Sequence, residues 1–226
     1  MDKTKQLVIL GDSAFAEIAY EYFSQDSAYE VVAFAVESAY LKRDLLLGVP
    51  VLPLEELEQH YPPERVEFFV AVVYTQLNRL RARLYTSMKA RGYRAASYVS
   101  PRASVWPNVR LGEHCFIFED NTLQPFVTLG DNVVLWSGNH IGHHSTIEDH
   151  VFIASHAVVS GFCRIGRNSF LGVNCTISNN VTLGPDNWLG PGVLITQDTG
   201  ADQLYKGEAT AAAKVGARRF FKIKES

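Results

Sequence analysis

The sequence predicts an α/β domain with a small, Rossmann-like parallel sheet, followed by a left-handed parallel β-helix of hexapeptide repeats. Two observations predict this fold class. Short apolar runs alternate with helical patterns in the first part of the chain, and an unbroken six-residue period of aliphatic residues follows. We therefore expect an α/β domain over residues 1–99, a β-helix over residues 100–200 and a tail over residues 201–226.

In the first domain, apolar runs predict short strands, and apolar residues at helical spacing predict helices. The expected strands cover 6–10, 29–35, 66–73 and 95–99, and the expected helices cover 14–24, 54–60 and 77–91. In such a sheet, the ligand crevice lies at the carboxyl ends of the strands. The residues at these ends are our candidate nucleotide-binding residues: Gly11, Asp12, Ser13, Glu37 and Tyr74.

The turn at Gly11 has two interpretations. Asp12 or Ser13 could cap the helix that follows. Alternatively, backbone amides at the helix start could hold a phosphate or a uracil-type ring. The turn lacks the three glycines of a dinucleotide fingerprint, so we do not expect an NAD site. Arg79 could be a phosphate partner or a solvated helix residue.

The second domain repeats every six residues. From Val105 to Ile195, each sixth residue is Val, Leu or Ile, sixteen times in succession, and small or β-branched residues lie two positions before most of them. Each hexad supplies a short strand and a corner, and three hexads close one coil of about 18 residues. The three cysteines occupy the small inward register at separations that are not multiples of 18, so we expect reduced, buried thiols.

Composition excludes several classes of function. The chain has 226 residues, of which 47% are hydrophobic and 20% charged, and its formal net charge is −3. This balance gives no electrostatic reason to expect nucleic acid or an acidic membrane as a partner. We see no transmembrane segment and no signal peptide, and we expect a cytoplasmic protein.

Five of the seven histidines lie between His140 and His156. His144, His150 and His156 share one slot of the hexad, so they fall on successive corners and cannot converge on one metal within a chain. We therefore expect no metal. A metal shared between subunits remains an alternative, as in the gamma class of carbonic anhydrases, and it would make the protein a hydratase.

His143 follows the inward Ile141 by two residues, which places it on an outer wall or a corner. A neutral imidazole there can take a proton from an amine or hydroxyl that attacks a thioester. The alternative is a surface or interface histidine with a structural hydrogen bond.

This arrangement resembles the bacterial nucleotide-sugar acetyltransferases of the sialic acid O-acetyltransferase type, which include N-acetyltransferases of UDP- or dTDP-linked amino sugars. The resemblance covers nearly all of residues 5–198. It implies that His143 is the catalytic base. Where that family commonly has Glu or Asp next, this chain has His144, and Glu148 or Asp149 could supply the missing carboxylate.

The resemblance also implies acetyl-CoA as co-substrate, a nucleotide-linked sugar as acceptor and a homotrimer with sites between subunits. Acetyl-CoA would lie along backbone amides near Ser155, His156, Gly161, Gly172 and Gly190. Sugar contacts would come from near Trp136, where that family often has Asn, and from Asn139. The implied activity is acetyl transfer to an amino or hydroxyl group. A non-catalytic trimeric scaffold that binds a nucleotide sugar is a further alternative.

Overall fold

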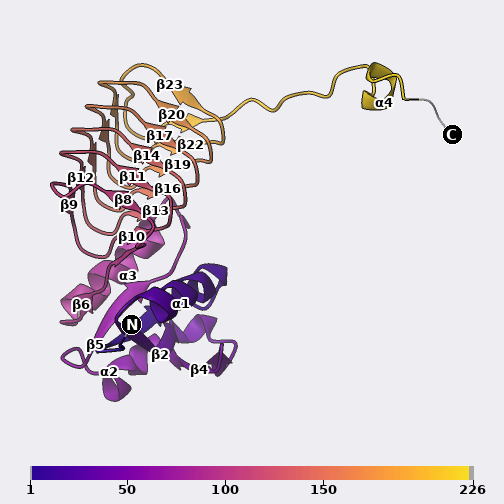
Figure 1. The fold of residues 1–226 in the computed structure, drawn as a ribbon. Coiled ribbons are helices and arrows are strands. Elements are labelled where there is room, and N and C mark those ends of the chain that lie inside the picture. Colours follow the sequence, from indigo (N-terminus) through magenta and orange to yellow (C-terminus); the bar gives the residue numbers. More distant parts are fainter. Residues whose placement is uncertain (1, 224–226) are drawn as a thin grey trace.

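The computed structural model describes residues 2–223 and contains both expected parts (Figure 1). The first is a six-stranded sheet in the order β3-β4-β2-β1-β5-β6, parallel except for the β3–β4 pair. Its strands are β1 Lys5–Leu10, β2 Tyr29–Val36, β3 Leu45–Leu46, β4 Val49–Pro53, β5 Val66–Val70 and β6 Arg94–Ala95. Its helices are α1 Ala14–Asp26, α2 Leu57–His60 and α3 Arg79–Ala90, with 3₁₀ turns at η1 Ser38–Tyr40 and η2 Leu54–Glu56.

One sequence expectation for this domain was wrong, and one structural element was missed. The single strand expected over 95–99 is two strands in different sheets, because β7 (Tyr98–Val99) pairs with the β-helix strand β10. The β3–β4 hairpin was not expected. Its turn residues Leu47 and Gly48 both have positive φ, and the apolar run around them hides the break between two strands.

The second part is a parallel β-helix with three sheets, in agreement with the sixfold period. One face, which we call the docking face because the α/β domain packs on it, contains β7, β10 Phe116–Ile117, β13 Val134–Leu135, β16 Phe152–Ile153, β19 Phe170–Leu171, β22 Trp188–Leu189 and β24 Leu204–Tyr205. The second face contains β8 Ser104–Val105, β11 Thr122–Leu123, β14 His140–Ile141, β17 Val158–Val159, β20 Thr176–Ile177 and β23 Leu194–Ile195. The third face contains β9 Arg110–Leu111, β12 Thr128–Leu129, β15 Thr146–Ile147, β18 Arg164–Ile165 and β21 Thr182–Leu183.

Three corners join these faces. The first corner follows the docking face and includes residues 136–139, 154–157, 172–175 and 190–193. The second corner follows the second face and includes residues 124–127, 142–145, 160–163 and 178–181. The third corner follows the third face and includes residues 112–115, 130–133, 148–151, 166–169 and 184–187. Along these corners a residue with positive φ recurs every six positions from His114 to Asp186.

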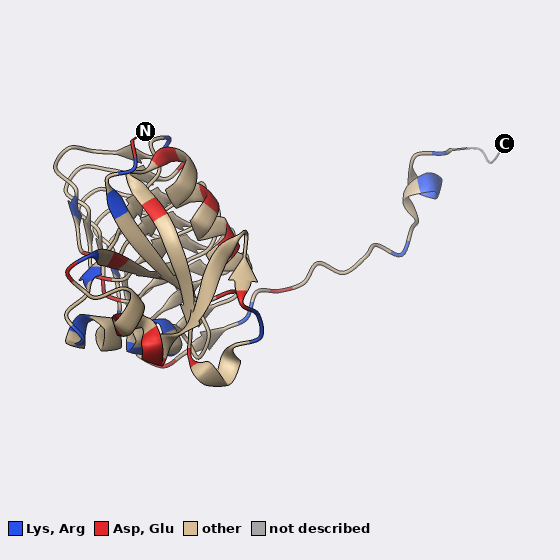
Figure 2. Cartoon of the chain, turned by 90° about the horizontal axis from the view of Figure 1, so that it is seen from below, with Lys and Arg blue, Asp and Glu red and all other residues tan. Residues whose placement is uncertain are grey.

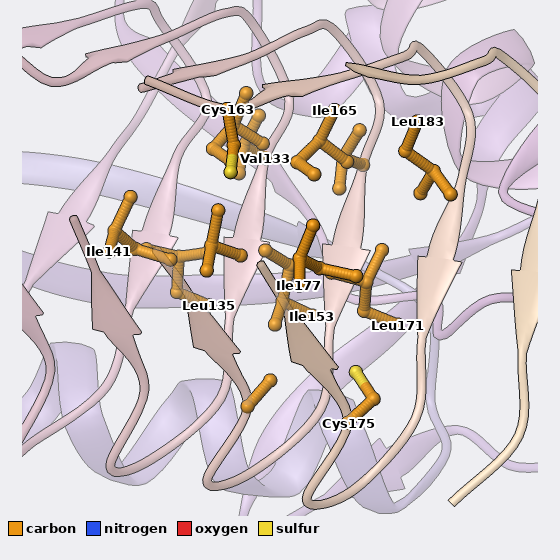
Figure 3. Close-up of a cluster of buried hydrophobic side chains, with 14 of the residues drawn as sticks. Val133, Leu135, Ile141, Ile153, Cys163, Ile165, Leu171, Cys175, Ile177 and Leu183 are labelled. Carbon is orange, nitrogen blue, oxygen red and sulfur yellow. The ribbon is translucent and has the colours of Figure 1, made fainter. Parts of the chain in front are cut away.

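The inward residues of the β-helix form one continuous aliphatic column (Figure 3). Leu135, Ile153 and Leu171 stack on each other at 0% exposure, which is the packing that the sixfold period predicts. The three cysteines are free and buried, as expected. Burial raises the pKa of the Cys115 and Cys175 thiols to about 12, which keeps both protonated and unreactive.

The α/β domain packs on the docking face through aromatic side chains. Outward residues of this face, among them Phe116 and Phe152, share one hydrophobic cluster with Phe15 and Phe23 of α1. Helix α3 runs along the third corner, where the Arg81 guanidinium is fully buried. The nucleotide-binding candidates are therefore held against one face of the β-helix.

After β24, residues 206–223 are exposed and lead away from the body to the short helix α4 Ala217–Phe220 (Figures 1 and 2). Basic and acidic residues are interspersed on the side of the molecule that Figure 2 shows. Within residues 2–223, no helix combines the length and the apolar character needed to cross a membrane.

Candidate functional site

His143 lies exposed on the second corner, as its place in the hexad predicts. Its backbone N–H donates to Oε1 of Gln124 at 2.9 Å, which ties it to the preceding coil. Its Nδ1 lies 3.1 Å from Nδ1 of His144. Within residues 2–223 its Nε2 forms no hydrogen bond, so the lone pair of that nitrogen is available when the proton is on Nδ1.

Gly161 makes room for the His143 ring. It stacks above His143 in the next coil, and a Cβ atom at this position would lie 2.8 Å from Cε1 and 2.9 Å from Nε2 of the imidazole. A side chain there would therefore displace the nitrogen that faces outward.

With His143 as the base, we expect Gly161→Ala to fold normally and to lower turnover about tenfold or more, because a small displacement of a catalytic group has a large kinetic cost. Steady-state kinetics and thermal unfolding would check this. Gly216→Ala, in the tail where an added Cβ meets nothing within 4 Å, is the control and should behave like the wild type. Unchanged turnover in the Gly161 variant would show that the position of the His143 ring beside this glycine does not affect the reaction.

The expectation that Glu148 or Asp149 supports His143 is wrong. Both carboxylates belong to the third corner, one corner further along the coil. Glu148 pairs with Arg164 and accepts the backbone N–H of Arg167. Asp149 accepts the backbone N–H of Asp131 at 2.8 Å.

The residues expected near acetyl-CoA divide between two corners. Ser155, His156, Gly172 and Gly190 lie on the first corner, and Gly161 lies on the second corner beside His143. These corners are the two edges of the second face. A donor that contacts both would therefore have to cross or flank this face.

The α/β domain contains a cavity of about 500 Å³ at the carboxyl ends of its strands. The connection from β1 leads to β2 on one side of the sheet, and the connection from β5 leads to β6 on the other side. The cavity lies at this change of direction, which is the usual ligand position in such sheets. Four of the predicted nucleotide-binding residues line it: Gly11, Asp12, Ser13 and Glu37.

The cavity also contains a residue that the sequence analysis missed. Arg83 lines it and donates two hydrogen bonds to the Glu37 carboxylate, at 2.9 and 2.8 Å. These bonds hold the pKa of Glu37 below its ordinary value. Arg83 lies one helical turn after Arg79, and this spacing was the available clue. Arg79 itself pairs with Asp186 at 2.6 Å and does not line the cavity.

The capping interpretation of the Gly11 turn is confirmed in position only. Ser13 occupies the N-cap position of α1 without a side-chain hydrogen bond. The Asp12 carboxylate pairs with Arg43 at 3.4 Å. Gly11 has φ +114°, and a Cβ there would lie 2.9 Å from the Ala71 carbonyl oxygen, so this turn requires glycine.

Three further candidates do not line the cavity. Trp136 packs against Phe15 and Phe118 in the domain contact, with ring centroids 5.3 and 4.3 Å away. Tyr74 is 44% exposed and packs on the docking face. Asn139 is 1% exposed and bonds to backbone groups inside the coil, which removes it as a sugar contact.

The histidines do not form a metal centre in the described chain. Residues 2–223 bring no three His, Cys, Asp or Glu side chains together in a metal-binding group. His114 and His150 lie two coils apart, and Asn132 between them bonds to Nδ1 of each at 2.9 Å. His114 Nε2 also accepts the Val70 N–H at 2.8 Å, which links the two domains.

Burial lowers the pKa of His114 to about 3, and the positive charge of Arg81 adds to this effect. In the unfolded chain the imidazole takes up a proton near pH 6.5, whereas in the folded protein it stays neutral down to about pH 3. The free energy of unfolding therefore falls as the pH falls between these two values. We expect His114 alone to lower the free energy of unfolding by about 2 kcal/mol from pH 7 to pH 5. Urea titrations at both pH values would measure this.

His114→Asn is the matched variant for that measurement, because Asn occupies the same corner position, with positive φ, at residue 168. Its stability should fall less steeply with acid than that of the wild type. Parallel pH profiles of the two proteins would contradict a neutral, buried His114.

The cavity and His143 of one chain lie on different sides of the β-helix. The α/β domain packs on the docking face, and the second corner is the edge of the prism opposite that face. A site that uses both therefore requires a second subunit.

Comparisons with known proteins agree with this architecture. Residues 126–161 match the family model described as bacterial transferase hexapeptide (six repeats), and residues 163–197 match that of the hexapeptide repeat of succinyl-transferase. The second part of the chain is thus a β-helix of hexapeptide repeats. A comparison with curated proteins found no match.

Three solved structures share the fold. The acetyltransferase domain of PglB from Neisseria gonorrhoeae has a TM-score of 0.81 at 22% identity, covering 90% of this chain and 97% of that one. PerB from Caulobacter crescentus, in complex with CoA and GDP-perosamine, has a TM-score of 0.79 at 24% identity, covering 88% and 92%. WeeI from Acinetobacter baumannii has a TM-score of 0.70 at 19% identity, covering 90% and 97%. The fold is therefore an α/β domain followed by a left-handed β-helix.

Proposed function

We propose that the protein transfers acetyl from acetyl-CoA to an amino group of a nucleotide-linked sugar. The observation that carries this proposal is the geometry of His143: an exposed imidazole on a β-helix corner, with Nδ1 engaged and Nε2 available. The shared fold of PerB, whose structure holds CoA and GDP-perosamine, supports the choice of substrates. Acetyl-CoA and nucleotide sugars are cytoplasmic metabolites, so we place the reaction in the cytoplasm.

In this reaction the amine nitrogen attacks the thioester carbonyl carbon of acetyl-CoA directly. The new C–N bond forms and the C–S bond breaks. His143 Nε2 takes the proton that the amine loses and passes it to the sulfur of the leaving CoA. No cysteine takes part, since all three thiols are buried and protonated.

The nucleotide would occupy the cavity lined by Gly11, Glu37 and Arg83. Since that cavity and His143 of one chain lie on different sides of the prism, we propose that a neighbouring subunit supplies the second half of the site. A homotrimer with three such sites satisfies this requirement.

The experiment is a screen of nucleotide amino sugars with acetyl-CoA, followed by mass spectrometry. We expect a product heavier by one acetyl group and stoichiometric release of free CoA thiol. Stabilisation of the protein by a nucleotide sugar but not by acetyl-CoA, without product, would indicate a scaffold. Stoichiometric zinc in the active, purified protein would indicate the hydratase.

A further inference from the structure

The two histidines of the candidate site are part of a stack of aromatic rings. The His144 imidazole lies between the rings of Phe126 and Phe162 in the coils on either side. The ring centroids are 4.6 and 4.8 Å apart, and the ring planes differ by 28° and 16°. Phe162 also presents its ring to His143, at 4.9 Å and 87°. Both faces of His144 are therefore covered by phenyl rings.

These two phenylalanines occupy positions that do not favour them. Both have positive φ, +67° at Phe126 and +58° at Phe162, in a slot that otherwise holds Asn, Asp, His or Gly. A bulky residue in this conformation is uncommon and has a conformational cost. Their side chains are 56% and 54% exposed, so burial in the chain's own core does not offset that cost.

The stack surrounds an imidazole pair that has no carboxylate partner. Within residues 2–223, no hydrogen bond or ion pair connects His143 or His144 to an acid. In the four second-corner segments between Gln124 and Val181, the two histidines are the only His, Lys, Arg, Asp or Glu residues, and the Cys163 thiol is buried. In the next coil, strand β18 follows this corner and carries Arg164, which is paired with Glu148. The positive charge that His143 gains during catalysis must therefore be stabilised in another way.

The contact between the two Nδ1 atoms sets the proton arrangement. At 3.1 Å, one Nδ1 must donate and the other must accept. For Nε2 of His143 to act as a base, its Nδ1 must carry the proton and donate it to His144. After proton transfer, the charge is shared along this hydrogen bond with a ring whose two faces contact aromatic π systems. Such faces attract cationic rings.

We propose that Phe126 and Phe162 are positioning residues for the catalytic base: their rings hold His144 as the acceptor of the His143 Nδ1 proton and stabilise the charge that the pair shares. In this chain the stacked rings thus stabilise the charge that a neighbouring carboxylate would otherwise stabilise. The inference rests on the proposed function, but part of its test does not require activity.

The test replaces both rings by Leu, which keeps apolar bulk and removes the π faces. We expect Phe126→Leu/Phe162→Leu to lower kcat about fivefold or more, with KM for acetyl-CoA and for the sugar unchanged within about twofold. The acid limb of the pH–rate profile should move about half a pH unit lower, because the protonated pair is less stable. Phe126→Tyr/Phe162→Tyr keeps both ring faces and should restore the wild-type values.

Nitrogen NMR of the histidine rings gives a readout without turnover. In the wild type we expect His143 protonated at Nδ1 and His144 protonated at Nε2, and in the Leu variant a mixture of tautomers and a lower titration midpoint. An unchanged pH profile and unchanged tautomers would overturn the inference, as would a raised KM at constant kcat, which would make the rings ligand contacts. Absence of acetyl transfer by the wild type, with the expected NMR result, would reject only the proposed function.

Discussion

Replacement of His143 by alanine is expected to lower turnover at least about a hundredfold while the protein remains folded and assembled. The imidazole is exposed and its side chain supports no core contact, so stability should change little. Its loss removes the imidazole whose Nε2 is free to take the amine proton when Nδ1 donates to His144. Single-turnover assays at saturating substrates would measure the effect on the chemical step.

His60→Ala is the control for this prediction, since it also removes an exposed imidazole but lies on α2, in the other domain. Its turnover should match that of the wild type. Near-normal turnover of His143→Ala would remove His143 from the role of base.

Replacement of Arg81 by methionine is expected to lower the free energy of unfolding by about 3 kcal/mol or more. The Arg81 side chain is 0% exposed, and burial lowers the pKa of its guanidinium to about 9. Its Nη1 donates to the carbonyl oxygen of Asn132 at 2.6 Å, and its Nη2 donates to that of His150 at 3.2 Å. Methionine would fill part of the space but leave these carbonyl groups without donors.

Arg79→Ala is the matched control on the same helix. Its ion pair with Asp186 is half exposed, and such pairs contribute about 1 kcal/mol or less. Urea unfolding of both variants would give the comparison. A loss below about 0.5 kcal/mol in Arg81→Met would show that the carbonyl groups find other partners.

The β-helix could be predicted almost completely from the sequence, because the six-residue period continues through every coil. The inward register, the buried thiols and the outer position of His143 all follow from counting residues. The same count places Glu148 five residues after His143, on the next corner, and so argues against the support that we expected from it. Large apolar residues of the docking face also recur every 18 residues, at Phe116, Val134, Phe152 and Phe170, and this pattern identifies the face that the α/β domain covers.

The candidate site could be predicted only in part, because several of its features depend on contacts between distant segments. Arg83 reaches the cavity through the packing of α3, which no local pattern specifies. Asn139 has the residue type of a sugar contact, but it occupies the inward register and satisfies backbone groups there. The ring stack around His144 arises because residues 18 apart lie in adjacent coils, so Phe126 and Phe162 become neighbours of a residue far from them in sequence.

The central claim is that His143 of one chain and the cavity of another form one site. Co-expression of two inactive variants tests it most directly: His143→Ala lacks the base, and Arg83→Glu places a second carboxylate beside Glu37 in the cavity. Mixed trimers, purified through a different tag on each chain, contain one interface that combines an intact histidine with an intact cavity. We predict that they recover about one third of wild-type activity. Activity no higher than that of the two inactive parents would contradict the account.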